Sequence, residues 1–117
     1  MKKILQLEEL AQMALGIIAL DLLPFEFSWW AWLLLFLSPD ISFVAYCVNT
    51  KVGAFVYNIF HHKGIALATA IAGLLLKQDV LLLVGALLFA HSSFDRLLGY
   101  GLKYSDDFKH THLGWMK

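Results

Sequence analysis

Four apolar blocks, separated by short polar segments, run along the chain. They lie at about residues 5–23, 29–48, 64–76 and 79–98, and residues 99–117 form a more polar tail. A helix rises about 1.5 Å per residue, so about 20 apolar residues cross a hydrocarbon core of about 30 Å. The third block is short for a full crossing unless the segment before it contributes. The pattern predicts an all-α fold in a single domain, residues 1–117: a polytopic integral membrane bundle of about four transmembrane helices.

The second block contains a polar interruption at Ser38-Pro39-Asp40. Serine is a favoured helix cap, proline fits the first helical position, and an aspartate is stabilised near a helix N-terminus. We therefore expect two half-helices here, with Ser38 as the cap of the second. An unpaired carboxylate inside a membrane costs about 2.5–3.5 kcal/mol, which also makes Asp40 a functional candidate. After this block, residues 52–60 predict a short helix that lies at the membrane interface or within the bundle.

The composition favours a bilayer over water as the surrounding medium. Apolar residues make up 60% of the chain and charged residues 15%, against about 45–50% and about 25% in soluble proteins. The basic residues form no run, so we expect no nucleic-acid partner. The single cysteine, Cys47, excludes an intrachain disulfide. The sequence also lacks the motifs of P-loop nucleotide hydrolases, α/β-hydrolases and dithiol redox enzymes.

The basic residues predict how the chain is oriented in the membrane. Cytoplasmic segments of membrane proteins are enriched in Lys and Arg. With the amino terminus in the cytoplasm and four spans, Lys77 alone of the nine basic residues falls outside. We therefore expect a multi-pass protein of the bacterial inner membrane with both termini in the cytoplasm. The basic residues on the cytoplasmic side are then Lys2, Lys3, Lys51, Lys63, Arg96, Lys103, Lys109 and Lys117.

His91 and Asp95 are four residues apart and so share one face of the last predicted helix. Counted from Asp79 at about 1.5 Å per residue, His91 lies about 18 Å into the membrane, nearer the cytoplasmic face. A histidine and a carboxylate one turn apart can bind a metal together, or the carboxylate can orient an imidazole that binds metal or moves protons. A hydrogen bond that merely closes the end of the helix accounts for the same spacing.

The other histidines fall near the same membrane face. On the predicted topology none of the five lies on the outer side, and Asp95, Asp106 and Asp107 lie with them. This common placement favours a single site that faces the cytoplasm. The histidines are His61, His62, His91, His110 and His112.

Four segments of the chain resemble a known family. The segments SPDISFVAY, KVGAFVYNIFHH, AHSSFDRLLGYGLKY and FKHTHLG are similar to the small bacterial membrane family described as domain of unknown function 4260, over roughly Leu5 to Gly114. The resemblance implies a helical, membrane-embedded protein and gives no particular activity. The positions that match the family pattern are Pro39, Asp40, Tyr57, Asn58, His61, His91, Asp95, Arg96 and His112.

A second, weaker similarity is to membrane-bound metal-dependent hydrolases. These enzymes carry an early Pro-Asp, a central histidine motif and a late H-x-x-x-D in a similar order. The central motif of this chain departs from their H-R-x-x-T-H form, because His61 is followed by His62-Lys63-Gly64.

The first functional hypothesis is a metal-dependent hydrolase that acts on a lipid-linked or phosphate substrate. It uses a divalent metal such as zinc or manganese, and the predicted metal ligands are His61, His91, Asp95 and His112. Asp40 is a base or a further ligand, and Arg96 or Lys103 holds a phosphate. The predicted catalytic residues are therefore Asp40, Asn58 and Arg96.

Two alternatives from other classes remain open. One is a transporter or proton relay through Asp40, His91 and Asp95, which we expect to be a homo-oligomer because four short spans enclose little volume. The other is a non-catalytic membrane subunit, in which the polar residues hold helices together and the tail binds a partner. Haem ligation by His61 and His91 is a further possibility that nothing else in the sequence supports.

Overall fold

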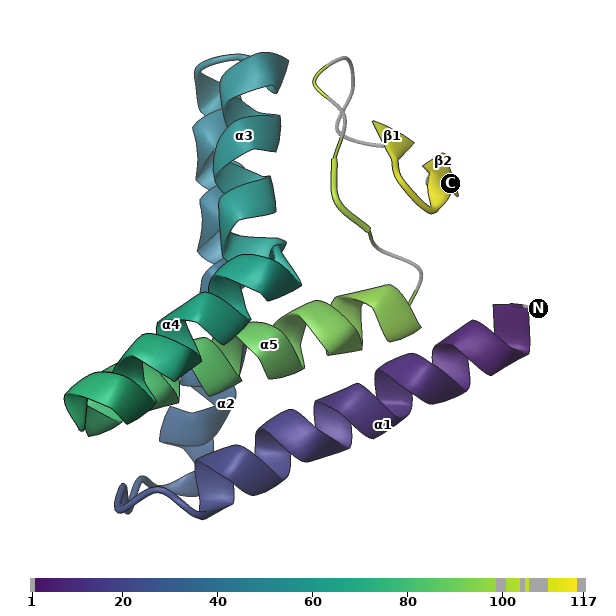
Figure 1. The fold of residues 1–117 in the computed structure, drawn as a ribbon. Coiled ribbons are helices and arrows are strands. Elements are labelled where there is room, and N and C mark those ends of the chain that lie inside the picture. Colours follow the sequence, from purple (N-terminus) through teal and green to yellow (C-terminus); the bar gives the residue numbers. More distant parts are fainter. Residues whose placement is uncertain (1, 99–100, 104, 106–109, 116–117) are drawn as a thin grey trace.

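The computed structural model describes residues 2–98, 101–103, 105 and 110–115. These residues form five α-helices, one 3-10 helix and a two-stranded hairpin, so the predicted all-α class is confirmed (Figure 1). The strands β1 (His110–Thr111) and β2 (Gly114–Trp115) pair antiparallel. The helices are α1 (Lys2–Asp21), α2 (Trp29–Leu37), the 3-10 helix η1 (Ser38–Cys47), α3 (Thr50–His61), α4 (Lys63–Leu76) and α5 (Asp79–Leu97).

Helix α5 is the centre of the fold and packs against both α1 and α4. In Figure 1 these three helices run alongside one another, and α3 stands across them with η1 packed against it. Small residues allow the close approach that is common between membrane helices. A side chain at Gly85 of α5 would place its Cβ 2.5 Å from the backbone nitrogen of Ala70 in α4. A Cβ at Gly16 of α1 would lie 2.8 Å from that of Ala90 in α5.

The second apolar block changes from an α-helix to a 3-10 helix at Ser38, so the predicted break exists. Pro39 has no N–H and cannot donate to the carbonyl of Leu35, four residues before it. Ser38 donates to this carbonyl instead, through its backbone N–H and through its hydroxyl at 2.7 Å. The prediction that Ser38 caps a new helix was therefore wrong in detail. The serine completes the turn that the proline leaves open, and the chain stays helical through the break.

Two helical segments of the described chain are long and apolar enough to cross a membrane. They are Trp29–Cys47, which joins α2 to η1, and Asp79–Leu97. Helices α3 and α4 add a third segment if they are counted as one, bent by 46°. Helix α1 is not among the segments apolar enough to cross a membrane, because Glu8 and Glu9 lie in its first half and further charges lie at its ends. Four spans are therefore not confirmed, whereas the short helix predicted at residues 52–60 is present as α3.

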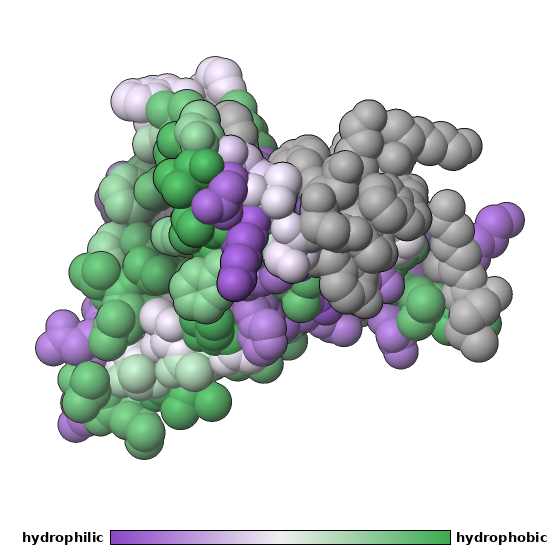
Figure 2. Space-filling view, turned by 90° about the horizontal axis from the view of Figure 1, so that it is seen from above, coloured by the Kyte–Doolittle hydropathy of each residue, from purple (hydrophilic) through white to green (hydrophobic). Residues whose placement is uncertain are grey.

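Several polar side chains are buried, and many large apolar side chains are exposed. His91 is fully buried, and Ser92, Ser93 and Asp95 are almost so. Leu22 and Leu75, by contrast, are about four-fifths exposed. Hydrophobic residues cover most of the face that Figure 2 shows on the side of α3 and α4. Soluble monomers rarely expose contiguous apolar patches larger than a few hundred Å², so this distribution favours a bilayer as the surrounding medium.

Candidate metal centre

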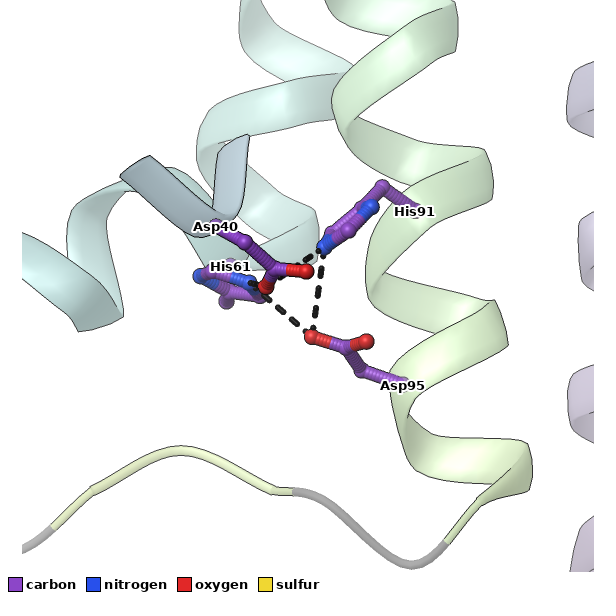
Figure 3. A group of neighbouring side chains, drawn as sticks. All are labelled: Asp40, His61, His91 and Asp95. Carbon is purple, nitrogen blue, oxygen red and sulfur yellow. Dashed lines mark hydrogen bonds and ion pairs between the residues drawn. The ribbon is translucent and has the colours of Figure 1, made fainter. Parts of the chain in front are cut away.

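Four side chains from three elements meet beside α5 (Figure 3). Asp40 comes from the first turn of η1, His61 from the last turn of α3, and His91 and Asp95 from one face of α5. One nitrogen or oxygen atom of each lies within 4.8 Å of the corresponding atoms of the other three. The predicted H-x-x-x-D pair therefore faces two residues that come from well before it in the sequence.

The two imidazoles alternate with the two carboxylates. Nε2 of His61 is 3.4 Å from Oδ1 of Asp40 and 3.0 Å from Oδ2 of Asp95. Nε2 of His91 is 3.1 Å from the same Asp40 oxygen and 3.3 Å from the same Asp95 oxygen. Each Nε2 thus faces two carboxylate oxygens, and each of these oxygens faces two nitrogens.

Backbone carbonyls fix which ring nitrogen carries the proton. Nδ1 of His61 lies 2.9 Å from the carbonyl oxygen of Tyr57, and Nδ1 of His91 lies 2.6 Å from that of Phe36. A carbonyl only accepts hydrogen bonds, so each Nδ1 is the donor, and in the neutral ring Nε2 then carries a lone pair. Among the described residues, Nε2 of His61 has no partner in hydrogen-bond geometry. Lone pairs of two nitrogens and two anionic oxygens converge, and only a cation or added protons can hold them together.

Three of the four side chains are buried, so the centre is accessible only on the side of Asp40. His91 is completely buried, and His61 and Asp95 are 3% and 6% exposed. The Asp40 side chain is 47% exposed. Three of the four groups are therefore fixed in the interior, and a small molecule can approach beside the fourth.

The junction between α3 and α4 holds His61 in place. The Ser92 hydroxyl of α5 donates to the carbonyl oxygen of His61 at 2.9 Å, which ties the end of α3 to α5. His62 follows in an extended conformation, and its Nδ1 accepts from the backbone N–H of Ile65 at 3.2 Å. His62 therefore caps α4 and is not one of the four converging residues.

Tyr57 supports the centre from the side of α3. Its ring stacks on His61 with the ring centroids 3.8 Å apart, and its hydroxyl donates to Oδ2 of Asp95 at 3.4 Å. The ammonium of Lys103 lies 4.9 Å from the centroid of the same ring. The family resemblance included Tyr57 but gave it no role, and its spacing of four from His61 was the available signal.

Asn58, which we predicted to be catalytic, contacts the C-terminal segment. Its amide nitrogen donates to the carbonyl oxygen of Lys103 at 2.7 Å, and its amide oxygen accepts from the Lys103 backbone N–H at 2.5 Å. This pairing resembles one rung of a β-ladder and holds Lys103 beside α3. Burial lowers the pKa of the Lys103 amine, while the charges of Asp95 and Asp40 act in the opposite direction.

Comparison with known proteins gives a family and no activity. The model of the domain of unknown function (DUF4260) matches residues 2–116. The chain belongs to this family. No curated protein and no solved structure matches it. What this DUF4260 protein does has to be inferred from its own site.

The structure does not bring His112 of this DUF4260 protein to the four converging residues. Nδ1 of His112 accepts from the backbone N–H of Leu102 at 2.7 Å, and its own backbone N–H donates to the Leu102 carbonyl at 2.9 Å. Burial lowers the pKa of His112, and the positive charge of Arg96 adds to this effect. Asp40 occupies the place among the converging groups that we had predicted for His112.

Arg96 directly follows Asp95 on α5, so its side chain leaves the helix about 100° away from the centre. Its positive charge acts on Lys63 of α4 and on His112 of the hairpin. Asp106, Asp107 and the side chain of His110, which we had grouped with the other residues of the cytoplasmic face, lie outside the described part of the chain.

Proposed function

We propose that Asp40, His61, His91 and Asp95 bind one divalent metal ion, and that the protein is a metal-dependent hydrolase in the membrane. The observation that carries this proposal is the convergence of two carboxylates with two imidazoles, whose tautomers are set by backbone carbonyls. Histidines that bind metal almost always donate their other ring N–H to a carbonyl, a carboxylate or water. The two carboxylates, one buried (Asp95) and one half-exposed (Asp40), also balance the charge of a divalent cation.

The spacing of the donor atoms suits a metal of the size of zinc. Four atoms each about 2.1 Å from a tetrahedral zinc ion lie about 3.4 Å from one another. The four nitrogen–oxygen distances here are 3.0–3.4 Å, and the nitrogen–nitrogen and oxygen–oxygen separations lie within 4.8 Å. Two imidazoles and two carboxylates also suit manganese or iron, which would add water ligands on the open side.

A metal in this position would supply the chemistry of hydrolysis. It acidifies a bound water and polarises a carbonyl or phosphoryl oxygen. Asp40 is the half-exposed ligand, so its carboxylate stands where a water and a substrate would enter. The ammonium of the buried Lys103 lies 4.9 Å from the centroid of the Tyr57 ring, close enough to the centre for Asp95 and Asp40 to act on its charge. These surroundings favour a substrate that carries a phosphate or another anionic group.

The first test is the metal content of detergent-purified protein with any tag removed, measured by mass spectrometry. We expect about one zinc, manganese or iron ion per chain, and its loss in a folded His91→Ala, Asp95→Ala variant. His112→Ala and His62→Ala are matched controls that should keep the metal, because both side chains contact backbone away from the centre. Wild-type protein that stays metal-free after zinc and manganese are added and washed away would refute the proposal and leave a proton relay as the better explanation.

Activity is tested separately, by phosphate or alcohol release from phosphatidic acid and from a water-soluble phosphodiester. Chelation should lower the rate by at least about a thousandfold, because the metal contributes several kcal/mol of transition-state stabilisation. Adding the metal back should restore the rate. A metal that is bound while neither substrate class is turned over would point to a structural metal site.

A further inference from the structure

A cavity of about 490 Å³ lies next to the candidate metal centre, between α1, α2 and α5. Its walls are almost entirely apolar, with Asp21 as the one charged residue among those that line it. Typical pockets for small organic ligands have volumes of about 300–1,000 Å³. The wall residues used below are Ile17 of α1, Trp29, Trp32, Leu33 and Phe36 of α2, and Leu87 of α5.

Phe36 joins this cavity to the metal centre. Phe36 is one of the residues that line the cavity, and its carbonyl oxygen accepts a hydrogen bond from Nδ1 of His91 at 2.6 Å. Its ring also meets the His91 ring edge to face, with the centroids 5.5 Å apart. One residue therefore both lines the cavity and orients a predicted metal ligand.

The cavity faces the part of the surface that a bilayer would cover. It follows α2 from Trp29 to Phe36, a distance of about 10 Å at 1.5 Å per residue. This helix belongs to the candidate span Trp29–Cys47. Leu33 is half-exposed at the cavity, and Leu34 beside it is exposed on the same helix. The material that surrounds such a surface in a membrane is lipid hydrocarbon.

We infer that this cavity binds the hydrocarbon chain of a lipid substrate, with the head group of that lipid at the Asp40 side of the metal centre. The inference rests on the proposed function and narrows its substrate to a single-chain or two-chain lipid with an anionic head group. In this arrangement the hydrocarbon chain lies along α2, and the end that carries the head group is near Phe36. The bond to be hydrolysed is then at the metal centre. The shape and the apolar lining of the cavity select for the hydrocarbon chain. The charged groups beside Tyr57 select for the head group.

The binding test uses the tryptophans in the cavity wall. The chain contains four tryptophans, so in a Trp30→Phe, Trp115→Phe background the remaining two indoles are those of Trp29 and Trp32. The probe is a lysophosphatidic acid with a dibrominated stearoyl chain, added to the protein in detergent, because bromine quenches indole fluorescence on contact. We expect saturable quenching at about one probe per chain.

Two substitutions on helix α2 serve as the test variant and its matched control. Leu33→Phe fills the cavity from its open side, and we expect at least tenfold weaker probe binding. Leu34→Phe adds the same volume to an exposed neighbour that does not line the cavity, and binding should be unchanged. Quenching that never saturates, or that is equal in both variants, would overturn the inference.

The same samples separate this inference from the proposed function. Metal content is measured on each, so loss of metal binding and loss of lipid binding are seen independently. In turnover, Leu33→Phe should raise the KM for phosphatidic acid about tenfold more than the KM for a water-soluble phosphodiester, and Leu34→Phe should leave both KM values unchanged. An equal effect on both substrates would mean that the cavity holds no part of the substrate and that the substitution disturbs the centre itself.

Discussion

At the scale of single residues, the two predicted histidine ligands are oriented by carbonyls from different helices. The carbonyl of Tyr57 belongs to the same helix as His61, whereas the carbonyl of Phe36 reaches His91 from α2. Rotation of either ring would leave its buried Nδ1–H without this partner, which costs about 1–3 kcal/mol. The ring positions are therefore set before any ion binds, and this lowers the cost of assembling the centre.

Tyr57 offers a test of this support. Tyr57→Phe removes the hydroxyl that donates to Asp95 and keeps the ring that stacks on His61. The loss of one hydrogen bond, about 0.5–1.5 kcal/mol, should weaken metal binding about two- to twelvefold. Competition with a chelating dye measures this affinity. Tyr57→Leu also removes the stack and should cost about 10–100-fold; affinities equal to wild type in both variants would show that Tyr57 does not support the centre.

Single residues also show what the sequence could predict about the site. The spacing of His91 and Asp95 and the cost of a carboxylate inside an apolar block both point to residues that now converge. The choice of the fourth predicted ligand depended on tertiary contacts that no spacing encodes. His112 and Asp40 were equally available, and only the fold shows that Leu102 engages the first while two imidazoles face the second.

At the scale of elements, the C-terminal segment is attached to α3 through a side chain. Lys103 pairs with Thr111 as an isolated antiparallel bridge, and Asn58 pairs with the other edge of the Lys103 backbone. The hairpin β1–β2 is thereby linked to the helix that carries His61. A two-residue hairpin has little stability of its own, so this attachment depends on the few hydrogen bonds that Asn58 provides.

Replacing Asn58 should release this segment without unfolding the bundle. Asn58→Leu removes two hydrogen bonds to Lys103, worth about 0.5–1.5 kcal/mol each, so the Lys103 amide should exchange its hydrogen about 5–150 times faster. Hydrogen exchange followed by mass spectrometry measures this rate. Asn49→Ala is the matched control: it removes the cap of α3, where the side chain accepts from Val52 at 2.7 Å, and should leave exchange at Lys103 unchanged.

The elements themselves were predicted unevenly. The helix expected at residues 52–60 and the last helix came from clear apolar patterns bounded by polar residues, and the structure places α3 and α5 within two residues of those limits. The change to a 3-10 helix could not be read from the sequence. Pro39 predicts an irregularity in the helix. Whether the helix ends, kinks or tightens to a 3-10 helix depends on which group donates a hydrogen bond to the Leu35 carbonyl.

At the scale of the whole molecule, the number of crossings depends on geometry that hydropathy does not contain. The third apolar block is part of a helix pair bent by 46°, and α1 carries charges that lower its mean hydropathy while one face still packs on α5. Apolar content therefore identifies the environment more readily than it counts the spans. The buried side chains of His61 and His91 lie inside an exterior with many exposed apolar side chains, and this distribution also favours a bilayer as the surrounding medium.

The predicted orientation is tested with single cysteines. Cys47 is the single cysteine, so Cys47→Ser gives a background free of thiols. A membrane-impermeant maleimide added to intact spheroplasts should label Lys77→Cys, which we place outside. Lys3→Cys should react only after the membrane is opened, because we place the amino terminus in the cytoplasm. Labelling of Lys3→Cys in intact spheroplasts would reverse the orientation, and equal labelling of both positions would contradict the assigned number of crossings.

The placement of the four converging residues along the chain has a consequence for biosynthesis. Asp40 and Asp95 are 55 positions apart (95 − 40), and half of the donor set lies on α5, the last helix to be made. A nascent chain that has inserted only as far as α4 carries Asp40 and His61 alone. With the proposed metal, the ion would join the first half of the protein to the second only after synthesis is complete. Incomplete chains would then lack this cross-link and remain open to membrane proteases, so the metal would distinguish finished molecules from unfinished ones.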